Sequence, residues 1–156
     1  YKAFEKAESS SGWSGSLSRC KDMGAVFHAT KNDFEGGYLN SYKNLIQAEV
    51  FDCELEQASE LLASGYYVAS AVIAGTVLET ALRDLCDREN IAKGKLDKMN
   101  SDLAKAGVFN KIVQKQITSY AGIRNSAAHG KSNEFMADDV KLMISGITQL
   151  LVTHLA

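Results

Sequence analysis

Three polar side chains stand close together in a run of small residues near the end of the chain. The segment AGIRNSAAHG, residues 121–130, places Arg124, Asn125 and His129 among alanine, serine and glycine. A guanidinium can donate two hydrogen bonds to a phosphate, and an imidazole can accept or give a proton near neutral pH. These residue types indicate phosphodiester chemistry. They are also typical of the solvated end of a helix, and the spacing leaves both interpretations open.

The spacing within this motif decides which side chains can act together. Asn125 and His129 are four residues apart, so they share one face of a helix. Arg124 is five residues from His129, which places it about 140° away around the helix axis. The arginine and the histidine can therefore serve one phosphate in three ways. The long arginine side chain swings round, the helix frays at Gly130, or a second subunit supplies one of the two groups.

The elements that must carry these residues are marked by apolar periodicity and by glycine stops. Proline is absent, which favours long helices. The pattern predicts an N-terminal loose arm, a first short helix that ends at two glycines, and five further helices. In order, the predicted segments are 1–16, 17–34, 38–63, 66–90, 96–107, 109–129 and a last helix that opens at Asp138 and Asp139.

No segment reads as a convincing strand, so the predicted fold class is all-α. We expect an up-and-down bundle of four to five core helices over residues 38–156, preceded by a helical arm over residues 1–37. The small residues Ala71, Ala74 and Gly75 allow another helix to approach the segment 66–90 closely. The apolar stripe of the segment 38–63 is predicted to comprise Ile46, Val50, Cys53, Ala58, Leu61 and Leu62.

Composition limits the function classes. The chain has 156 residues and a net charge of -2, so no global field attracts it to nucleic acid or anionic lipid, and any such contact must be local. Cys20, Cys53 and Cys86 are widely spaced and predict free thiols in a reducing cytoplasm. No apolar run reaches the ~20 residues of a membrane span, and no metal-ligand cluster is evident. The chain begins at Tyr1, as a domain cut from a longer protein would.

The motif RNSAAH resembles the R-x4-6-H signature of the HEPN superfamily, in which an asparagine commonly follows the arginine. The upstream segment AVIAGTVLETALRDLCDREN is similar to the other core helix of that fold. The resemblance covers roughly residues 40–155. Many HEPN proteins are metal-independent endoribonucleases, often toxins or parts of defence systems, and they dimerise so that two copies of the motif face one cleft.

The resemblance implies a role for each matching residue. Arg124 would bind the scissile phosphate, and His129 would act as general acid or base while the RNA 2′-hydroxyl attacks. Asn125 would orient the phosphate or His129. Glu79 and Arg83, an i,i+4 pair on the other core helix, would face the cleft as substrate-binding residues, although an ordinary ion pair has the same spacing.

The same resemblance leaves a second function open. The domain would then be a non-catalytic binding or dimerisation module, or an accessory domain of a larger protein. No cofactor and no metal are expected in either case. The expected partners are a second copy of the chain and RNA, with an antitoxin or a larger protein as further candidates.

Overall fold

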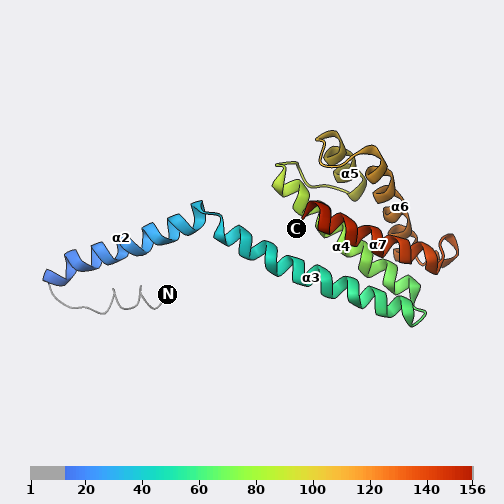
Figure 1. The fold of residues 1–156 in the computed structure, drawn as a ribbon, viewed down its shortest axis with the longest axis horizontal. Helices are drawn as coiled ribbons and strands as arrows, with labels where there is room; N and C mark the ends of the chain where they lie inside the picture. Colours follow the sequence, from blue (N-terminus) through green and yellow to red (C-terminus); the bar gives the residue numbers. More distant parts are fainter. Residues whose placement is uncertain (1–12, 156) are drawn as a thin grey trace. The chain divides into compact units, whose positions relative to one another are not determined.

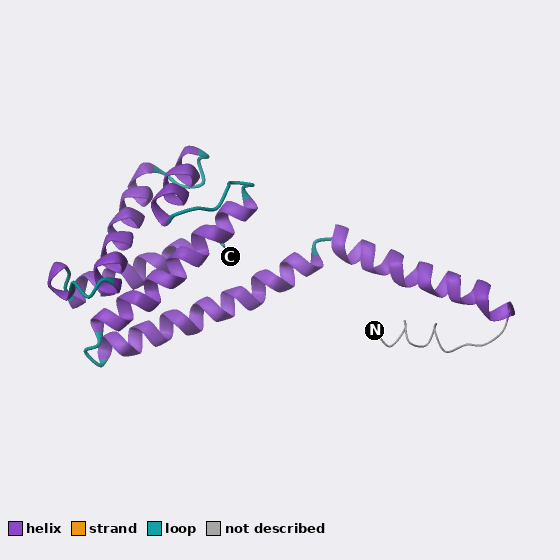
Figure 2. Cartoon of the chain, turned by 180° about the vertical axis from the view of Figure 1, so that it is seen from behind, coloured by secondary structure: helices purple, strands orange, loops and turns teal. Residues whose placement is uncertain are grey.

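The computed structural model describes the backbone of residues 13–155, and the side chains of residues 21–37, 46–47 and 49–155. Every regular element in this part of the chain is helical, and the all-α prediction is confirmed (Figures 1 and 2). The chain divides into two compact units, Tyr1–Leu45 and Ile46–Ala156. Among the described residues, no helix combines the length and apolarity that crossing a membrane would need.

The first unit contains helix α2, Trp13–Glu35, and the beginning of α3. Gly37 separates the two helices with a φ of 71°, so the predicted break is confirmed. The loose arm expected over residues 1–16 is wrong for residues 13–16, which form the first turn of α2, while residues 1–12 lie outside the described part. Serine and glycine cost a helix about 1 kcal/mol or less per residue, which a long helix can absorb.

The second unit is built from the remaining helices, and its glycine stops agree with the sequence. Gly65, Gly107 and Gly130 have φ values of 86°, 83° and 70°, in the left-handed region that favours glycine. The elements are α3 (Tyr38–Ala63), α4 (Tyr67–Arg88), α5 (Leu96–Lys105), α6 (Lys111–Ala128), the 3-10 helix η1 (Ser132–Glu134) and α7 (Ala137–His154).

Helix α4 is the centre of the core and packs against α5, α6 and α7. Its fully buried apolar residues include Val77, Leu78, Ala81 and Leu82. The stripe predicted on α3 is confirmed at Ala58, which is fully buried, and is wrong at Ile46, Val50 and Cys53, which are exposed. The buried residues that the prediction omitted are Phe51 and Leu55, which lie one turn apart on a neighbouring face of the helix.

Side chains fix the start and the middle of α6. At its start, the Asn110 carboxamide oxygen accepts hydrogen bonds from two backbone N–H groups of the first turn, at 2.9 and 3.0 Å. Along its length, the Asn100 amide nitrogen of α5 donates to the Gln114 carbonyl and to the Thr118 hydroxyl, both at 3.0 Å. At its end, Gly130 turns the chain toward η1. The helix that carries the arginine and histidine motif is therefore held firmly in the bundle.

Candidate functional site

The side chain of Arg124 crosses α4 at a glycine. Gly75 is buried, and a Cβ at this position would lie 2.6 Å from the Arg124 Cβ and would clash with its Cγ. These atoms belong to the rigid beginning of the arginine side chain. Only glycine at position 75 therefore lets α6 approach closely enough for the arginine to lie across α4.

The carboxylate of Glu79, one turn after Gly75 on α4, accepts hydrogen bonds from two guanidinium groups. Arg124 Nη2 donates to Glu79 Oε2 at 2.8 Å, and Arg83 Nη2 donates to Glu79 Oε1 at 2.8 Å. The Glu79 side chain is 25% exposed, and those of Arg124 and Arg83 are 35% and 43% exposed. The three groups carry a net charge of +1, and unused N–H donors of both arginines remain within reach of solvent.

Asn125 joins this cluster. Arg124 Nη1 donates to Asn125 Oδ1 at 3.2 Å, so the exposed amide helps to fix the guanidinium plane. The sequence suggested that Asn125 orients a phosphate or His129, and that role stays a prediction. Its backbone carbonyl accepts a hydrogen bond from the His129 N–H at 3.0 Å, which closes the last turn of α6.

His129 lies at the C-cap of α6 and is exposed. Among the described contacts, its imidazole takes no part in the cluster around Arg124. The helix ends at Ala128 without earlier fraying, and Gly130 follows it in the left-handed conformation. The structure thus brings Arg124, Asn125, Glu79 and Arg83 together in one chain, and His129, exposed at the end of the same helix, has no side-chain partner among the described residues.

Side-chain contacts that the sequence did not predict hold the segment after His129, and we call these contacts the clasp. The Ser126 hydroxyl donates to Glu134 Oε2 at 2.6 Å, and Lys131 forms an ion pair with the same carboxylate at 3.4 Å. The hydrogen bond from Ser126, and then that from Lys131, lower the pKa of Glu134. Tyr67 adds a hydrogen bond to the Ser132 carbonyl at 3.3 Å. These contacts join residues on the two sides of a loop, so no periodic pattern in the sequence predicts them.

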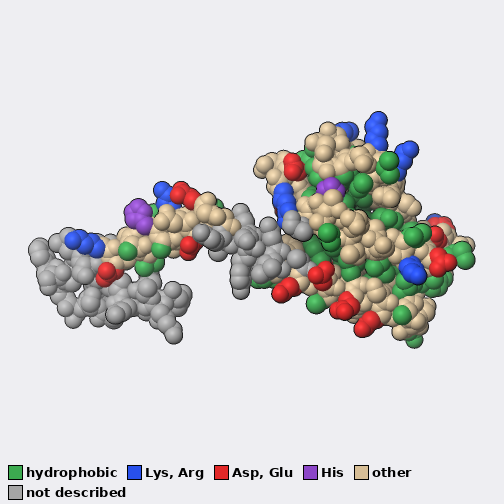
Figure 3. Space-filling view, in the orientation of Figure 1, with side chains coloured by type: hydrophobic (Ala, Val, Ile, Leu, Met, Phe, Trp, Pro, Cys, Tyr) green, Lys and Arg blue, Asp and Glu red, His purple; other side chains and the backbone are tan. Residues whose placement is uncertain are grey.

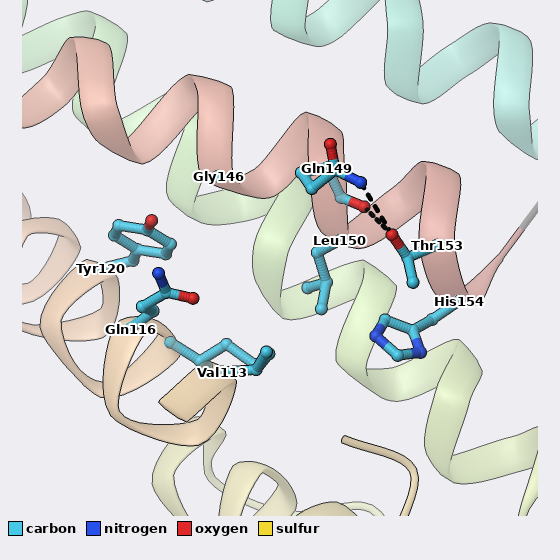
Figure 4. A pocket seen from close by; sticks show the side chains of 9 residues that line it. Val113, Gln116, Tyr120, Gly146, Gln149, Leu150, Thr153 and His154 are labelled. Carbon is cyan, nitrogen blue, oxygen red and sulfur yellow. Dashed lines mark hydrogen bonds between the residues drawn. The ribbon is translucent and has the colours of Figure 1, made fainter. Parts of the chain in front are cut away.

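A groove of about 180 Å³ lies on another side of α6, against α7 (Figure 4). Tyr120 rests on Gly146, where a Cβ would clash with the phenol group, and burial raises the pKa of Tyr120. The groove contains none of the motif residues. Its lining residues are Val113, Gln116, Ile117, Tyr120, Gly146, Gln149, Leu150, Thr153 and His154.

Within the described ranges, no group of three or more His, Cys, Asp or Glu side chains could hold a metal ion. Cys53 and Cys86 are free thiols, and the Cys20 side chain lies outside the description. Comparison with known proteins found no match to this chain among family models, curated proteins or solved structures.

Proposed function

We propose that this protein is a metal-independent endoribonuclease of the HEPN type that acts as a homodimer. One observation carries the proposal. A part-exposed arginine, Arg124, is fixed by Gly75 and Glu79, and an exposed histidine, His129, stands five residues later at the end of the same helix. Such a pair matches what cleavage of an RNA phosphodiester needs.

The reaction uses the RNA's own 2′-hydroxyl as the nucleophile. Its oxygen forms a bond to phosphorus, its proton goes to an imidazole base, and the bond from phosphorus to the 5′-oxygen breaks. A second, protonated imidazole gives its proton to that leaving oxygen. The products are a 2′,3′-cyclic phosphate and a 5′-hydroxyl. DNA lacks the nucleophile and is not cleaved.

Arg124 stabilises the charge that develops on the pentavalent phosphate. A single well-placed donor of this kind is worth a few kcal/mol of transition-state stabilisation. Glu79 restricts the rotamers of Arg124 before RNA binds, so less conformational freedom is lost on binding. Because Arg124 and His129 are about 140° apart around α6, the partner subunit's His129 is the proton donor or acceptor that can face this arginine across a shared cleft.

A non-catalytic binding or dimerisation module is the second candidate, and one observation favours it. Arg124 already has a carboxylate partner on the core helix α4, at 2.8 Å. In that case the guanidinium joins α4 to α6 as a structural ion pair, and the exposed residues around it serve assembly, with an antitoxin or a larger protein as a partner.

Cleavage of labelled single-stranded RNA in EDTA separates the two functions. We expect the wild-type protein to leave 2′,3′-cyclic phosphate ends, and His129→Ala to cleave about 10²- to 10⁴-fold more slowly, the range for loss of a general acid or base. The matched control is His28→Ala, because His28 is exposed on α2 and should leave the rate unchanged.

Three results would count against the proposal. Absence of cleavage by the wild-type protein across varied RNAs would support the module. Activity that disappears in EDTA would contradict the metal-independent mechanism. A monomer at high micromolar concentration in light scattering would contradict the shared cleft.

A further inference from the structure

Charge is distributed very unevenly over the second unit. Acidic side chains gather over α3, and basic ones gather at the opposite edge over α5 and α6 (Figure 3). The part of α3 from residue 46 to residue 63 contains no lysine or arginine, whereas its acidic residues are Glu49, Asp52, Glu54, Glu56 and Glu60. Helix α6 is the reverse, since it has three cations and no acidic residue. The net charge of -2 therefore conceals a local basic surface.

One face of α6 is exposed from its first residue to the histidine. We call it the α6 outer face, and its members, which recur at intervals of three or four residues, are Lys111, Lys115, Ser119, Gly122, Asn125 and His129. It has no acidic side chain, and its one aromatic ring is the imidazole of His129 at its end. A Cβ at Gly122 would meet no atom within 4 Å, so this face is open at its middle. At 1.5 Å per residue it is about 27 Å long.

The cations at the start of this face are not neutralised by neighbours. Neither Lys111 nor Lys115 forms an ion pair with a described residue. Both are exposed. On the adjacent helix α5, two lysines balance two aspartates, and Lys98 and Lys105 both pair with Asp102, at 2.9 and 3.3 Å. The excess of positive charge at this end of α6 is therefore that of Lys111 and Lys115.

We propose that the α6 outer face binds the sugar–phosphate backbone of single-stranded RNA and leads the strand from Lys111 and Lys115 toward His129. The inference rests on the proposed ribonuclease function and adds the path of its substrate. Lysines bind phosphates as point charges, and the small residues between them let a strand approach the helix closely. Because the lysines contact phosphates and not bases, binding tolerates different base sequences and depends strongly on salt.

A second copy of the chain is the competing occupant, with its acidic α3 against this face. Lysine is depleted in the cores of protein interfaces, whereas a row of cations without acids fits a polyanion. The test must therefore measure RNA binding and oligomeric state together.

Binding is measured by fluorescence anisotropy with a labelled oligouridine in EDTA. All proteins carry His129→Ala, so that cleavage cannot affect the result. Replacing Lys111 and Lys115 by glutamine should weaken binding about 25-fold at 0.1 M salt. The slope of log affinity against log salt should become shallower by about 1.4, since each lost phosphate contact on a single strand removes about 0.7.

Lys141→Gln is the matched control. Lys141 is exposed on α7 and has no ion pair with a described residue. Its position is about 140° around the helix from Gly146, which faces α6. We expect its loss to change affinity by less than twofold.

Unchanged binding by the double variant would overturn the path on α6, even if the wild-type protein cleaves RNA. Weaker binding by the double variant, with no cleavage by the wild type, would support the path and contradict the nuclease. If the double variant also loses its dimer in light scattering, the face is an interface between copies and the inference is wrong.

Discussion

Helix α6 packs against α4 and α7 through the same kind of contact, in which a large side chain of α6 lies on a glycine of the other helix. Gly75 of α4 lies under Arg124, and Gly146 of α7 lies under Tyr120. Beyond Gly75 stands Glu79, which fixes the arginine with an ion pair at 2.8 Å. Beyond Gly146 the lining of the groove contains no carboxylate, and the groove remains open. Both contacts thus bring the helices close together. The α4 contact differs because the neighbouring Glu79 carboxylate adds an ion pair to it.

The two contacts also differ in how easily they could yield to a larger residue. At Gly75 the opposing atoms are Cβ and Cγ of Arg124, whose positions follow from the backbone of α6. At Gly146 they are the hydroxyl and the outer ring carbons of Tyr120, at the far end of a side chain that borders an open groove. We therefore expect the first contact to be rigid and the second to be adaptable.

Gly75→Ala should have the largest effect. Overpacking costs about 1–3 kcal/mol, and the gain in helix propensity returns about 0.5–1, so we expect the free energy of unfolding to fall by about 1–2 kcal/mol. Cleavage of RNA should fall as well, because Arg124 is displaced. Urea unfolding followed by circular dichroism measures the first effect. A variant as stable as the wild type would show that the crossing at Gly75 is not rigid.

Gly146→Ala should have a smaller effect, within about 1 kcal/mol of the wild type, because the Tyr120 ring can move into the groove and the helix gains propensity. The same urea experiment measures it. Gly122→Ala is the reference, since nothing lies within 4 Å of that position, and it should stabilise the protein by about 0.5–1 kcal/mol. A loss at Gly146 equal to the loss at Gly75 would remove the proposed difference between the two contacts.

The sequence predicted the helices well because their signals are local. Gly37, Gly65, Gly107 and Gly130 end or separate helices as expected, and each has a positive φ. The spacing of Glu79 and Arg83 also predicted an i,i+4 ion pair, which is present. These features depend on residues within one or two turns of each other, so tertiary packing did not need to be known.

The phase of the helices and the contacts between them were harder to predict. The sequence places Ile46, Val50 and Cys53 in the apolar stripe of α3, but all three side chains are exposed. The bond from Arg124 to Glu79 joins residues 45 apart, and it depends on the rotation of both helices about their axes. The small residues near Gly75 indicated a close approach of helices, but they did not indicate which side chain would lie there.

The smallest predicted effect concerns the hydrogen bond from Ser126 to Glu134, which is part of the clasp at the end of α6. Its removal tests whether this bond fixes the end of the helix in addition to the two glycine contacts. The pKa of Glu134 is lowered from 4.5, chiefly by the hydrogen bond from Ser126. A carboxylate with a lowered pKa stabilises the folded state above its unfolded pKa, and this contribution is lost as pH falls through the folded value. Ser126→Ala should therefore lower the thermal midpoint at neutral pH, and the difference from the wild type should shrink well below pH 4.5.

Ser119→Ala is the control for this measurement, because Ser119 is exposed on the same helix and has no carboxylate partner among the described residues. Its effect on the thermal midpoint should not vary with pH. If the Ser126→Ala difference were as large in acid as at neutral pH, the hydroxyl would act through packing and not through the charge of Glu134.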